Sequence, residues 1–557
     1  MVKKFFNLLG KEFVGLHEAA YLLAFFTFLS QLLGLIRDRM LAGTFGASAA
    51  LDAYYAAFRI PDLIFVAVAS IVSVSILVPF IIERLQKSET EAREFLDAIF
   101  SFFAVLMVAV SIVAFFLAPT LLALIFPKII GGAYGAELVV MTHWLLLSPI
   151  LLGFSNLLAS VTQAKHRFFS YAISPILYNA GIIFGLLVFY PLFGLSGLAL
   201  GVVLGALCHL VVQIISVGRL FPRFRPLFNF KIIKRVVGLS FSRTLALSAS
   251  QIASLALIAF AAYLAVGSVS VFNFSWNLQS VPLAIVGASY TVALFPTISR
   301  LFGAGEKEKF LKEMTTAARH ITFWSLPIVV LFIVLRAQIV RTVLGSGNFD
   351  WSDTRLTAAA LAFFSISILA QSLILLFVRG YYAGGNTKKP LIINLFSAAL
   401  IVIFAFGFLW LFKRWEFFRY FVESLLRVDN VAGAEVLMLP LGFSVAQIIN
   451  AAIFWFYFAR RFPTFSPIVT RTFFEVFSTS VIMGFIVYRS LNVFDKIFNL
   501  NTLPGVFLQG LLSGFIGIAV GIIILILLKN REIKEVWLTL HHKIWKAKII
   551  APEPESL

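Results

Sequence analysis

Long uncharged apolar stretches alternate with short polar segments along the whole chain. The stretches are continuous runs, unlike the alternating segments of about ten residues that form a membrane β-barrel. Many of them exceed the roughly 20 residues that an α-helix needs to cross the hydrocarbon core of a bilayer. The pattern predicts an all-α polytopic membrane protein with about 14 transmembrane helices, near residues 19–44, 52–82, 95–126, 136–163, 169–190, 195–218, 236–266, 270–299, 313–345, 355–380, 389–412, 434–459, 472–492 and 503–528.

The distribution of Lys and Arg predicts the orientation of these spans. The segment "GRLFPRFRPLFNFKIIKR" at 218–235 has six basic residues and no acidic one, whereas the loops "FGASAALD", "YPLFGLS" and "VGSVS" have no basic residue. Loops rich in Lys and Arg stay on the cytoplasmic side of a membrane. We therefore expect the basic segment and both chain termini to be cytoplasmic, and an even number of spans agrees with this.

The basic segment divides the first twelve expected spans into two sets of six. The second span of each set has an early proline (Pro61, Pro282), an apolar stretch and a late proline (Pro79, Pro296). Two halves of equal topology are typical of transporters that bind substrate between them, whereas prolines also kink helices without any repeat. The expected parts are an N-terminal cytoplasmic segment 1–18, an N-lobe 19–218, a basic linker 219–235, a C-lobe 236–460 with an outer amphipathic insert 413–433, a final helix pair 472–528 and a basic cytoplasmic tail 529–557.

The composition agrees with a membrane protein and argues against several other classes. The 557 residues are 61% hydrophobic and 13% charged, whereas about a quarter of the residues of a soluble domain are charged. The net charge of +19 is explained by basic loops that face anionic membrane lipids, so we expect membrane lipids and no nucleic acid as partners. The single cysteine, Cys208, excludes a disulfide or a cysteine metal cluster within the chain.

Six charges lie between apolar stretches in the segment from Gly34 to Leu63. An ionised side chain is costly in contact with lipid, so we expect these charges to face a polar interface or a wet cavity. Arginine stays protonated and its planar fork bonds two oxygens of a pyrophosphate or carboxylate. The charged residues are Arg37, Asp38, Arg39, Asp52, Arg59 and Asp62.

We expect Arg37 and Arg59 to bind substrate. The acids Asp38, Asp52 and Asp62 either join them or orient them. The alternative is that Arg37 and Asp38 neutralise each other at a helix end and only determine topology. Asp52 and Arg59 share a helical face. They lie about 10 Å apart along the axis, so no direct ion pair is expected between them.

Further polar positions extend the candidate substrate site. Gln31 and Gly34 share a stripe of the first span with Asp38, and Gly34 would let a ligand or another backbone approach closely. In the second half, Arg243, Gln251 and Asn277 are candidates. Hydrogen bonding between helices is the alternative role for these side chains.

Enzyme motifs are missing from the sequence. It has no nucleotide-binding loop, HExxH, GxSxG or cysteine pair. We therefore expect a transporter with no catalytic residue, no metal site and no cofactor.

Several of these stretches resemble the MurJ/MviN family of lipid II flippases, within the multidrug/oligosaccharidyl-lipid/polysaccharide exporter superfamily. They are "GLIRDRMLAGTFGASAALDAYYAAFRIPDL", "SQIASLALIAFAAYLAVGSVSVFNFSWNLQSVPLAIVGASYTVALFPTISR" and "GYYAGGNTKKP", and their order and spacing match along most of residues 20–460. By position, Arg37 and Asp38 match the family's Arg-Asp pair in the first helix, Asp52 its acid in the second helix and Arg59 a basic residue there.

The resemblance implies two six-helix lobes with a central cationic cavity, and a groove for the lipid tail formed by the last two helices. It implies transport of an undecaprenyl-pyrophosphate-linked glycan lipid from the inner to the outer leaflet of the bacterial cytoplasmic (inner) membrane, by alternating access. The energy would come from the membrane potential or a monovalent cation, and cell-wall synthesis proteins are further candidate partners.

The chain departs from the family at four positions, Gln31, Phe65, Val66 and Asn277, where family members have arginines. The cavity is therefore expected to be less cationic than in typical members. This leaves two alternatives to lipid II transport. One is an exporter of another polyprenyl-linked polysaccharide or of a small molecule, and the other is a non-transporting membrane scaffold for cell-wall enzymes.

Overall fold

The computed structural model describes residues 16–72, 74–225 and 229–545. All regular elements within these ranges are helices, and they form two compact units. Unit 1 takes its residues from 1–281, 343–364 and 386–450, and unit 2 from 282–342, 365–385 and 451–557. The prediction of an all-α polytopic membrane protein is confirmed. The two six-helix lobes stay a prediction.

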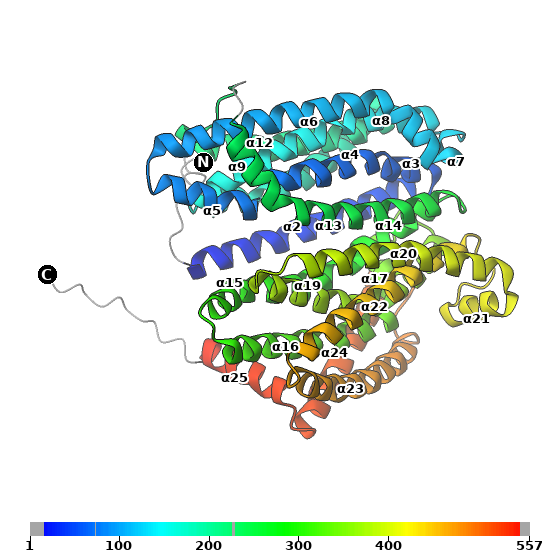
Figure 1. The fold of residues 1–557 in the computed structure, drawn as a ribbon. Helices are drawn as coiled ribbons and strands as arrows, with labels where there is room; N and C mark the ends of the chain where they lie inside the picture. The colour runs from blue at the N-terminus through cyan, green and yellow to red at the C-terminus, as the bar shows by residue number, and fades with distance from the viewer. Residues whose placement is uncertain (1–15, 73, 226–228, 546–557) are drawn as a thin grey trace. The chain divides into compact units, whose positions relative to one another are not determined.

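Unit 1 contains the following elements wholly or for the most part (Figure 1): α2 (Leu16–Phe45), α3 (Ala49–Ala57), α4 (Arg59–Ile64), η1 (Phe65–Ala69), η2 (Ser70–Val72), α5 (Val74–Leu85), α6 (Glu89–Ile125), α7 (Pro127–Ile130), α8 (Gly135–Leu145), α9 (Leu147–Ala164), α10 (Phe168–Phe184), η3 (Gly185–Phe189), α11 (Tyr190–Phe193), α12 (Leu195–Val217), η4 (Gly218–Leu220), α13 (Phe230–Ala262), α14 (Ser268–Pro282), α18 (Trp351–Ile366), α20 (Lys388–Arg414), α21 (Glu416–Leu426) and η6 (Ala434–Leu437).

Unit 2 contains η5 (Leu283–Ala288), α15 (Ser289–Gly303), α16 (Lys307–Val334), most of α17 (Arg336–Leu344), α19 (Ile368–Ala383), α23 (Phe465–Phe494), α24 (Leu503–Leu527) and α25 (Arg531–Trp545). One further helix, α22 (Met438–Arg461), runs from unit 1 into unit 2.

The described residues contain 11 helices that are long and apolar enough to cross a membrane, or 12 when α18 and α19 count as one bent span. The sequence predicts 14, and the two expected spans outside this set are 19–44 and 52–82. The first lies within the single helix α2, whereas the second is divided among α3, α4, η1, η2 and α5. The count of 14 therefore stays a prediction.

Prolines explain where the second expected span is divided. Proline has no N–H to donate and its ring clashes with the carbonyl one turn earlier, so the helical hydrogen-bond register changes around it. Pro61 in α4 is followed by the π-helical turn η1, and Pro282 at the end of α14 is followed by the π-helical turn η5. The late prolines Pro79 and Pro296 lie inside α5 and α15. The two landmarks found in the sequence thus share one local structure.

Glycines let α10, η3 and α12 pack backbone against backbone in unit 1. A Cβ atom placed on Gly181 would lie 2.3 Å from the Cα of Gly205, and one on Gly185 would lie 2.4 Å from the Cα of Gly201. Pairs of small residues four apart bring membrane helices together in this way. The pattern "GIIFG" facing "GVVLG" therefore fixes this helix pair.

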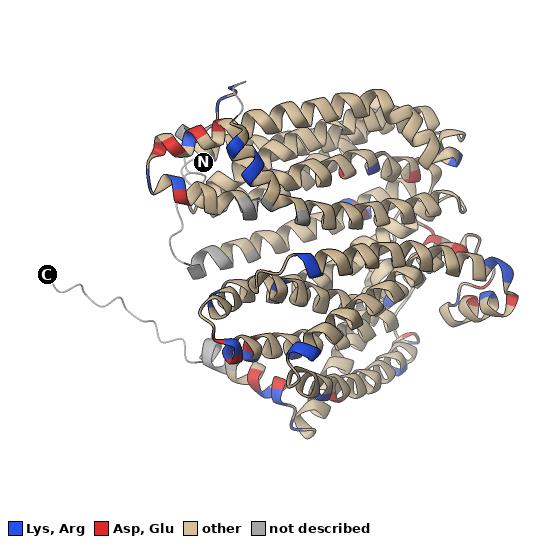
Figure 2. Cartoon of the chain, in the orientation of Figure 1, with Lys and Arg blue, Asp and Glu red and all other residues tan. Residues whose placement is uncertain are grey.

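Charged residues are sparse along the long helices and gather near their ends (Figure 2). The insert predicted at 413–433 contains the short amphipathic helix α21, with Phe417, Tyr420 and Phe421 exposed and Val422 and Leu426 buried. The exposed aromatic face has the composition of a helix that lies in a membrane interface. Its location on the outer face stays a prediction.

Candidate functional site

One face of α14 organises the charges of the N-terminal helices. Ser270, Asn273 and Asn277 are three, four and seven residues apart, so they form a polar stripe along one side of a helix. Each of them bonds a different charged residue, all within unit 1: Asp52, Arg59 and Asp38 respectively. The α14 stripe, defined by these three residues, is therefore the centre of the candidate site.

Arg37 and Asp38 form an ion pair on α2. The Arg37 guanidinium donates from Nε and Nη2 to Oδ1 of Asp38, at 2.9 and 2.7 Å. Its Nη1 donates to Oδ1 of Asn179 on α10 at 3.0 Å. Asp38 is buried and its second oxygen accepts from Nδ2 of Asn277 at 2.9 Å. The Arg37 side chain keeps 21% exposure, so the pair is neutral overall and still accessible on the arginine side.

The hydrogen-bond partners of Arg59 are neutral groups. Its Nε donates to the Tyr55 carbonyl oxygen at 3.1 Å, and its Nη2 donates to Oδ1 of Asn273 at 2.7 Å. Asp62, one turn further along α4, interacts with it electrostatically. Within the described part of the chain, Arg59 thus uses two of its five N–H donors. The others are available to oxygens of a ligand.

Asp52 accepts hydrogen bonds at the N-terminus of α14. Its Oδ2 accepts from the Gly267 backbone N–H at 2.7 Å, and its Oδ1 accepts from the N–H and the hydroxyl of Ser270 at 2.8 and 2.7 Å. A carboxylate satisfies the orphan donors of a helix start and complements its dipole. Asp52 and Arg59 form no direct pair here, as their spacing predicts. Asp52 positions the α14 stripe that holds Arg59.

The remaining predicted residues lie on the helices α2 and α13. Gln31 and Gly34 are half-buried on α2, and a Cβ added at Gly34 would meet no described heavy atom within 4 Å. Gly34 therefore borders open space. Gln251 is half-buried on α13. Arg243 also lies on α13, but its side chain is outside the described part of the structure.

Sequence reasoning gave Asn179 and Ser270 no role in this site. Asn179 orients Arg37 and also donates to Ser30 and to the Pro175 carbonyl oxygen. The sequence signal for Ser270 was available, because it continues the stripe of Asn273 and Asn277 by one turn. No such periodic signal exists for Asn179, whose partner Arg37 is 142 residues away in sequence.

Unit 2 contains a large apolar cavity of about 920 Å³. It lies between α16, α23, α24 and α25, and its wall includes Trp324, Leu331, Met483, Ile522 and Trp537. Sites for small organic ligands have volumes of about 300–1,000 Å³. The predicted lipid-tail groove of helices 472–528 stays a prediction, and this cavity is where unit 2 has room for an apolar chain.

The first part of the basic tail is attached to unit 2 by ion pairs. Arg319 on α16 donates to Glu532 at 2.5 Å, and both side chains are buried. Glu535 bonds Arg531 at 2.7 Å and His320 at 3.0 Å. The sequence predicts only a basic cytoplasmic tail, because it shows neither the buried pair nor the contribution of α25 to the apolar cavity. Residues 546–557 of the tail are outside the described range.

The described ranges contain no group of three or more His, Cys, Asp or Glu residues placed to hold a metal ion.

Comparison with known proteins gives one consistent family. Residues 41–509 match the family model described as "Lipid II flippase MurJ". The chain is 26% identical over 382 residues to the probable lipid II flippase MurJ of Buchnera aphidicola subsp. Acyrthosiphon pisum, covering 67% of this chain and 74% of that protein. It is 27% identical over 383 residues to the probable lipid II flippase MurJ of Thermotoga maritima, covering 67% and 76%.

Solved structures share the fold. The chain superposes on the inward closed conformation of a lipid II flippase MurJ with a TM-score of 0.74 and 22% identity, over 92% of this chain and 99% of that one. An inward-facing multidrug resistance MATE family transporter of the MOP superfamily gives a TM-score of 0.63 and 15% identity, over 79% and 96%. At these identities the likeness concerns the fold alone.

Proposed function

The chain belongs to the lipid II flippase MurJ family, and from this premise we propose that it moves lipid II across the bacterial inner membrane for cell-wall synthesis. Its relatives are flippases, so it acts as a transporter rather than an enzyme. The basic loops and both termini face the cytoplasm, as the distribution of Lys and Arg predicts.

The arrangement of Arg59 carries this proposal. A lipid-linked pyrophosphate is anionic and cannot cross hydrocarbon without polar partners. Arg59 is fixed by Asn273 and the Tyr55 carbonyl oxygen and keeps N–H donors for oxyanions. Arg37 is fixed on two sides by Asp38 and Asn179 and keeps an accessible edge. Planar guanidinium groups held in this way bind phosphate oxygens in a defined geometry.

The lipid tail would occupy the apolar cavity of unit 2. Its wall is formed mainly by apolar side chains, including Phe323, Ile518 and Leu525, with Lys529, Asn530 and Lys534 among its polar members. Bilayer hydrocarbon is as apolar as this wall, so the cavity would select the tail by packing rather than by removing it from water. The headgroup and the tail are thus bound by chemically distinct surfaces.

Alternating access moves the headgroup outward without a cofactor in this proposal. When the cytoplasm is negative, outward movement of an anion gains roughly 2.3 kcal/mol per charge per 100 mV. Coupling to a monovalent cation is the alternative, and an imposed potential without a cation gradient separates the two. Cell-wall synthesis proteins are proposed as further partners through the basic loops.

Reconstituted vesicles provide the test of this function. We expect purified protein to flip lipid II, and Arg59→Ala or Arg37→Ala to reduce flipping per folded molecule by about 10- to 100-fold, since a hydrogen bond to a charged group contributes roughly 1.5–3 kcal/mol. Arg59→Lys should recover part of the activity, because it keeps the charge and loses the planar fork.

Arg39→Ala is the matched control, because Arg39 lies on the same helix and bonds the Val343 carbonyl oxygen. It should leave flipping per folded molecule unchanged. Preference for another undecaprenyl-linked glycan over lipid II would favour the related exporter function suggested by Gln31 and Asn277. Wild-type protein that flips no lipid would favour the scaffold, and full activity in both alanine variants would contradict the role of the arginines.

A further inference from the structure

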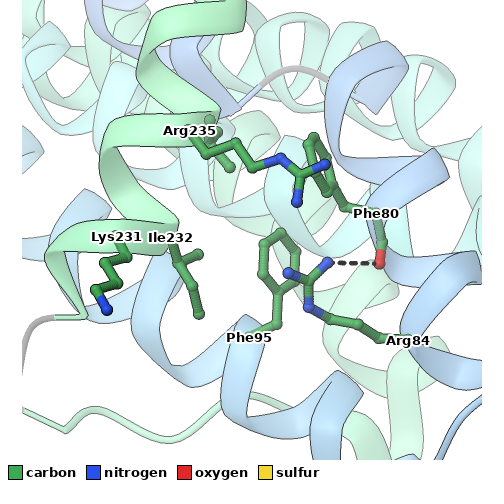
Figure 3. A pocket seen from close by; sticks show the side chains of 7 residues that line it. Phe80, Arg84, Phe95, Lys231, Ile232 and Arg235 are labelled. Atoms are coloured by element: carbon green, nitrogen blue, oxygen red, sulfur yellow. Dashed lines mark hydrogen bonds between the residues drawn. The ribbon is translucent and has the colours of Figure 1, made fainter.

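A second cationic site lies in unit 1, away from the α14 stripe. A cavity of about 170 Å³ is lined by Phe80 and Arg84 of α5, Phe95 of α6, and the first two turns of α13, which contribute Lys231, Ile232, Arg235 and Val236. Figure 3 shows Arg84 and Arg235 extending from different helices toward Phe80 and Phe95. The lining thus brings together residues that are about 150 positions apart in sequence.

The two arginines are held by aromatic rings. The Arg84 guanidinium carbon lies 4.2 Å from the centroid of the Phe95 ring and 5.6 Å from that of Phe80. The Arg235 guanidinium carbon lies 5.1 Å from the same Phe80 ring. An aromatic face stabilises a cation and leaves the in-plane N–H donors of a guanidinium pointing outward. Arg84 donates one of these N–H groups to the Phe80 carbonyl oxygen, at 3.1 Å.

The wall of this cavity has three cationic side chains and no carboxylate. The nearest acids along α5 and α6, Glu83 and Glu94, are exposed and do not line it. Like charges that share a site destabilise one another. A bound anion would relieve this repulsion for Arg84, Lys231 and Arg235 together.

The backbone adds to the same preference. Asn229 caps the 33-residue helix α13 by accepting from the Ile232 N–H at 3.3 Å, and Lys231 and Ile232 of the first turn line the cavity. Unsatisfied N–H groups and the helix dipole favour negative charge at such an end. Before the undescribed residues 226–228, Arg223 and Arg225 are bound to α6, because Asp97 accepts from the Arg223 N–H at 2.7 Å and pairs with Arg225 at 3.3 Å. The site is therefore held in position by several side chains.

We propose that this cavity binds the phosphate group of an anionic lipid or of a small soluble phosphate ester. Its volume is roughly that of six water molecules at about 30 Å³ each, which suits one phosphate group. Guanidinium groups bind phosphate oxygens in pairs, and Lys231 adds a point charge. The bound phosphate joins the start of α13 to the end of α5, independently of which substrate the chain transports.

Purified protein in a maltoside micelle and a phosphate-free buffer allows two probes to be compared. One is glycerol 3-phosphate, a soluble phosphate monoester, and the other is phosphatidylglycerol, a lipid whose headgroup carries a phosphodiester. Binding is measured by the rise in melting temperature with ligand concentration, and lipid adducts are counted by native mass spectrometry. We expect saturable binding of at least one probe.

The double variant R84Q/R235Q should weaken this binding by about tenfold or more, since it removes two charged hydrogen-bond donors. The double variant K87Q/K234Q is the matched control. It removes one positive charge from the turn that follows α5 and one from α13, at exposed residues that do not line the cavity, and it should bind like the wild type. Binding of phosphatidylglycerol alone identifies a lipid site, and binding of both probes identifies a general phosphate site.

The proposal fails if neither probe binds saturably to the wild type, or if the control variant loses binding as strongly as R84Q/R235Q. If R84Q/R235Q does not fold, R84K/R235K replaces it, because lysine keeps the charge and loses the planar fork. Unchanged affinity in that variant would then count against binding by the two guanidinium groups.

Discussion

At the scale of single residues, the charges of α2–α4 have different tasks although they lie within one short segment. Asp38 neutralises Arg37 and Asp52 caps α14, whereas Arg59 is held by a neutral amide and a carbonyl oxygen. Arg59 therefore keeps more N–H donors for a ligand than Arg37 does, although Asp62 interacts with it electrostatically. The sequence placed all of them in one candidate site, and the hydrogen bonds separate them.

Asp52→Asn is expected to lower stability more than transport. An asparagine has one acceptor and directs its NH₂ group at N–H donors of Gly267 or Ser270, so at least one buried donor loses its partner at a cost of about 1–3 kcal/mol. The melting temperature of the purified variant should fall, and flipping per folded molecule should stay near that of the wild type.

Ser275→Ala is a suitable control for that variant, because the buried Ser275 hydroxyl bonds only carbonyl oxygens of its own helix among the described contacts. It should melt close to the wild type. A strong loss of flipping in correctly folded Asp52→Asn would show instead that Asp52 acts on the substrate.

At the scale of helices, composition at the contact faces decides which elements can pack. The glycine contacts between α10, η3 and α12 leave no room for a side chain, whereas other glycines of the same unit border open space. Gly201 and Gly238 are the clearest contrast, because a Cβ at Gly201 would lie 2.5 Å from the Gly185 Cα and one at Gly238 would meet no described atom within 4 Å.

Gly201→Leu should therefore prevent correct packing of α12. Overpacking of a core typically costs 1–3 kcal/mol, and a clash with backbone is at the upper end or beyond. We expect little folded protein in size-exclusion chromatography of the solubilised variant. Gly238→Leu should fold normally, and equal yields of the two variants would contradict the backbone packing described.

The stability of the packing of helix α25 is expected to depend on pH through the carboxyl group of Glu535. Burial by itself raises the pKa of this carboxyl. The hydrogen bond from Arg531, the charge of Arg319 and the interactions with His320 outweigh it, so the pKa lies below its ordinary value of 4.5. A lowered pKa in the folded state contributes stability above about pH 4.5 that is lost as the pH falls through the folded-state pKa.

Glu535→Gln should consequently lower the melting temperature at pH 7, and the difference from the wild type should shrink below about pH 4.5. The control is Glu308→Gln, at an exposed position in the first turn of α16. A difference between wild type and Glu535→Gln that stays constant from pH 7 to pH 4 would exclude this role of the carboxylate.

At the scale of the whole molecule, we expect the basic segments, rather than any contact, to determine the orientation in the membrane. A cysteine at Leu192, in an exposed position of α11, should react with an impermeant maleimide added to intact cells. A cysteine at Lys234 should react only after permeabilisation. Both are placed in a Cys208→Ser background, since Cys208 is the single native cysteine. Reaction at position 234 in intact cells would reverse the proposed orientation.

The sequence by itself determined the helical class, the membrane location, most of the span positions and the segment that carries the candidate charges. These features depend on local composition and on periods of a few residues, which can be read along the chain. The family could also be recognised, because the stretch 34–63 combines charges and glycines in an unusual order.

Only the tertiary structure decided how those charges are paired. Three hydrogen bonds join Arg37 to Asn179, Arg59 to Asn273 and Asp38 to Asn277, over sequence separations of 142, 214 and 239 residues. Single polar residues in apolar helices have no period that identifies their partners, and the buried pair of Arg319 and Glu532 gave no signal for the same reason. Local patterns set the elements, while contacts between distant segments set the chemistry of the site.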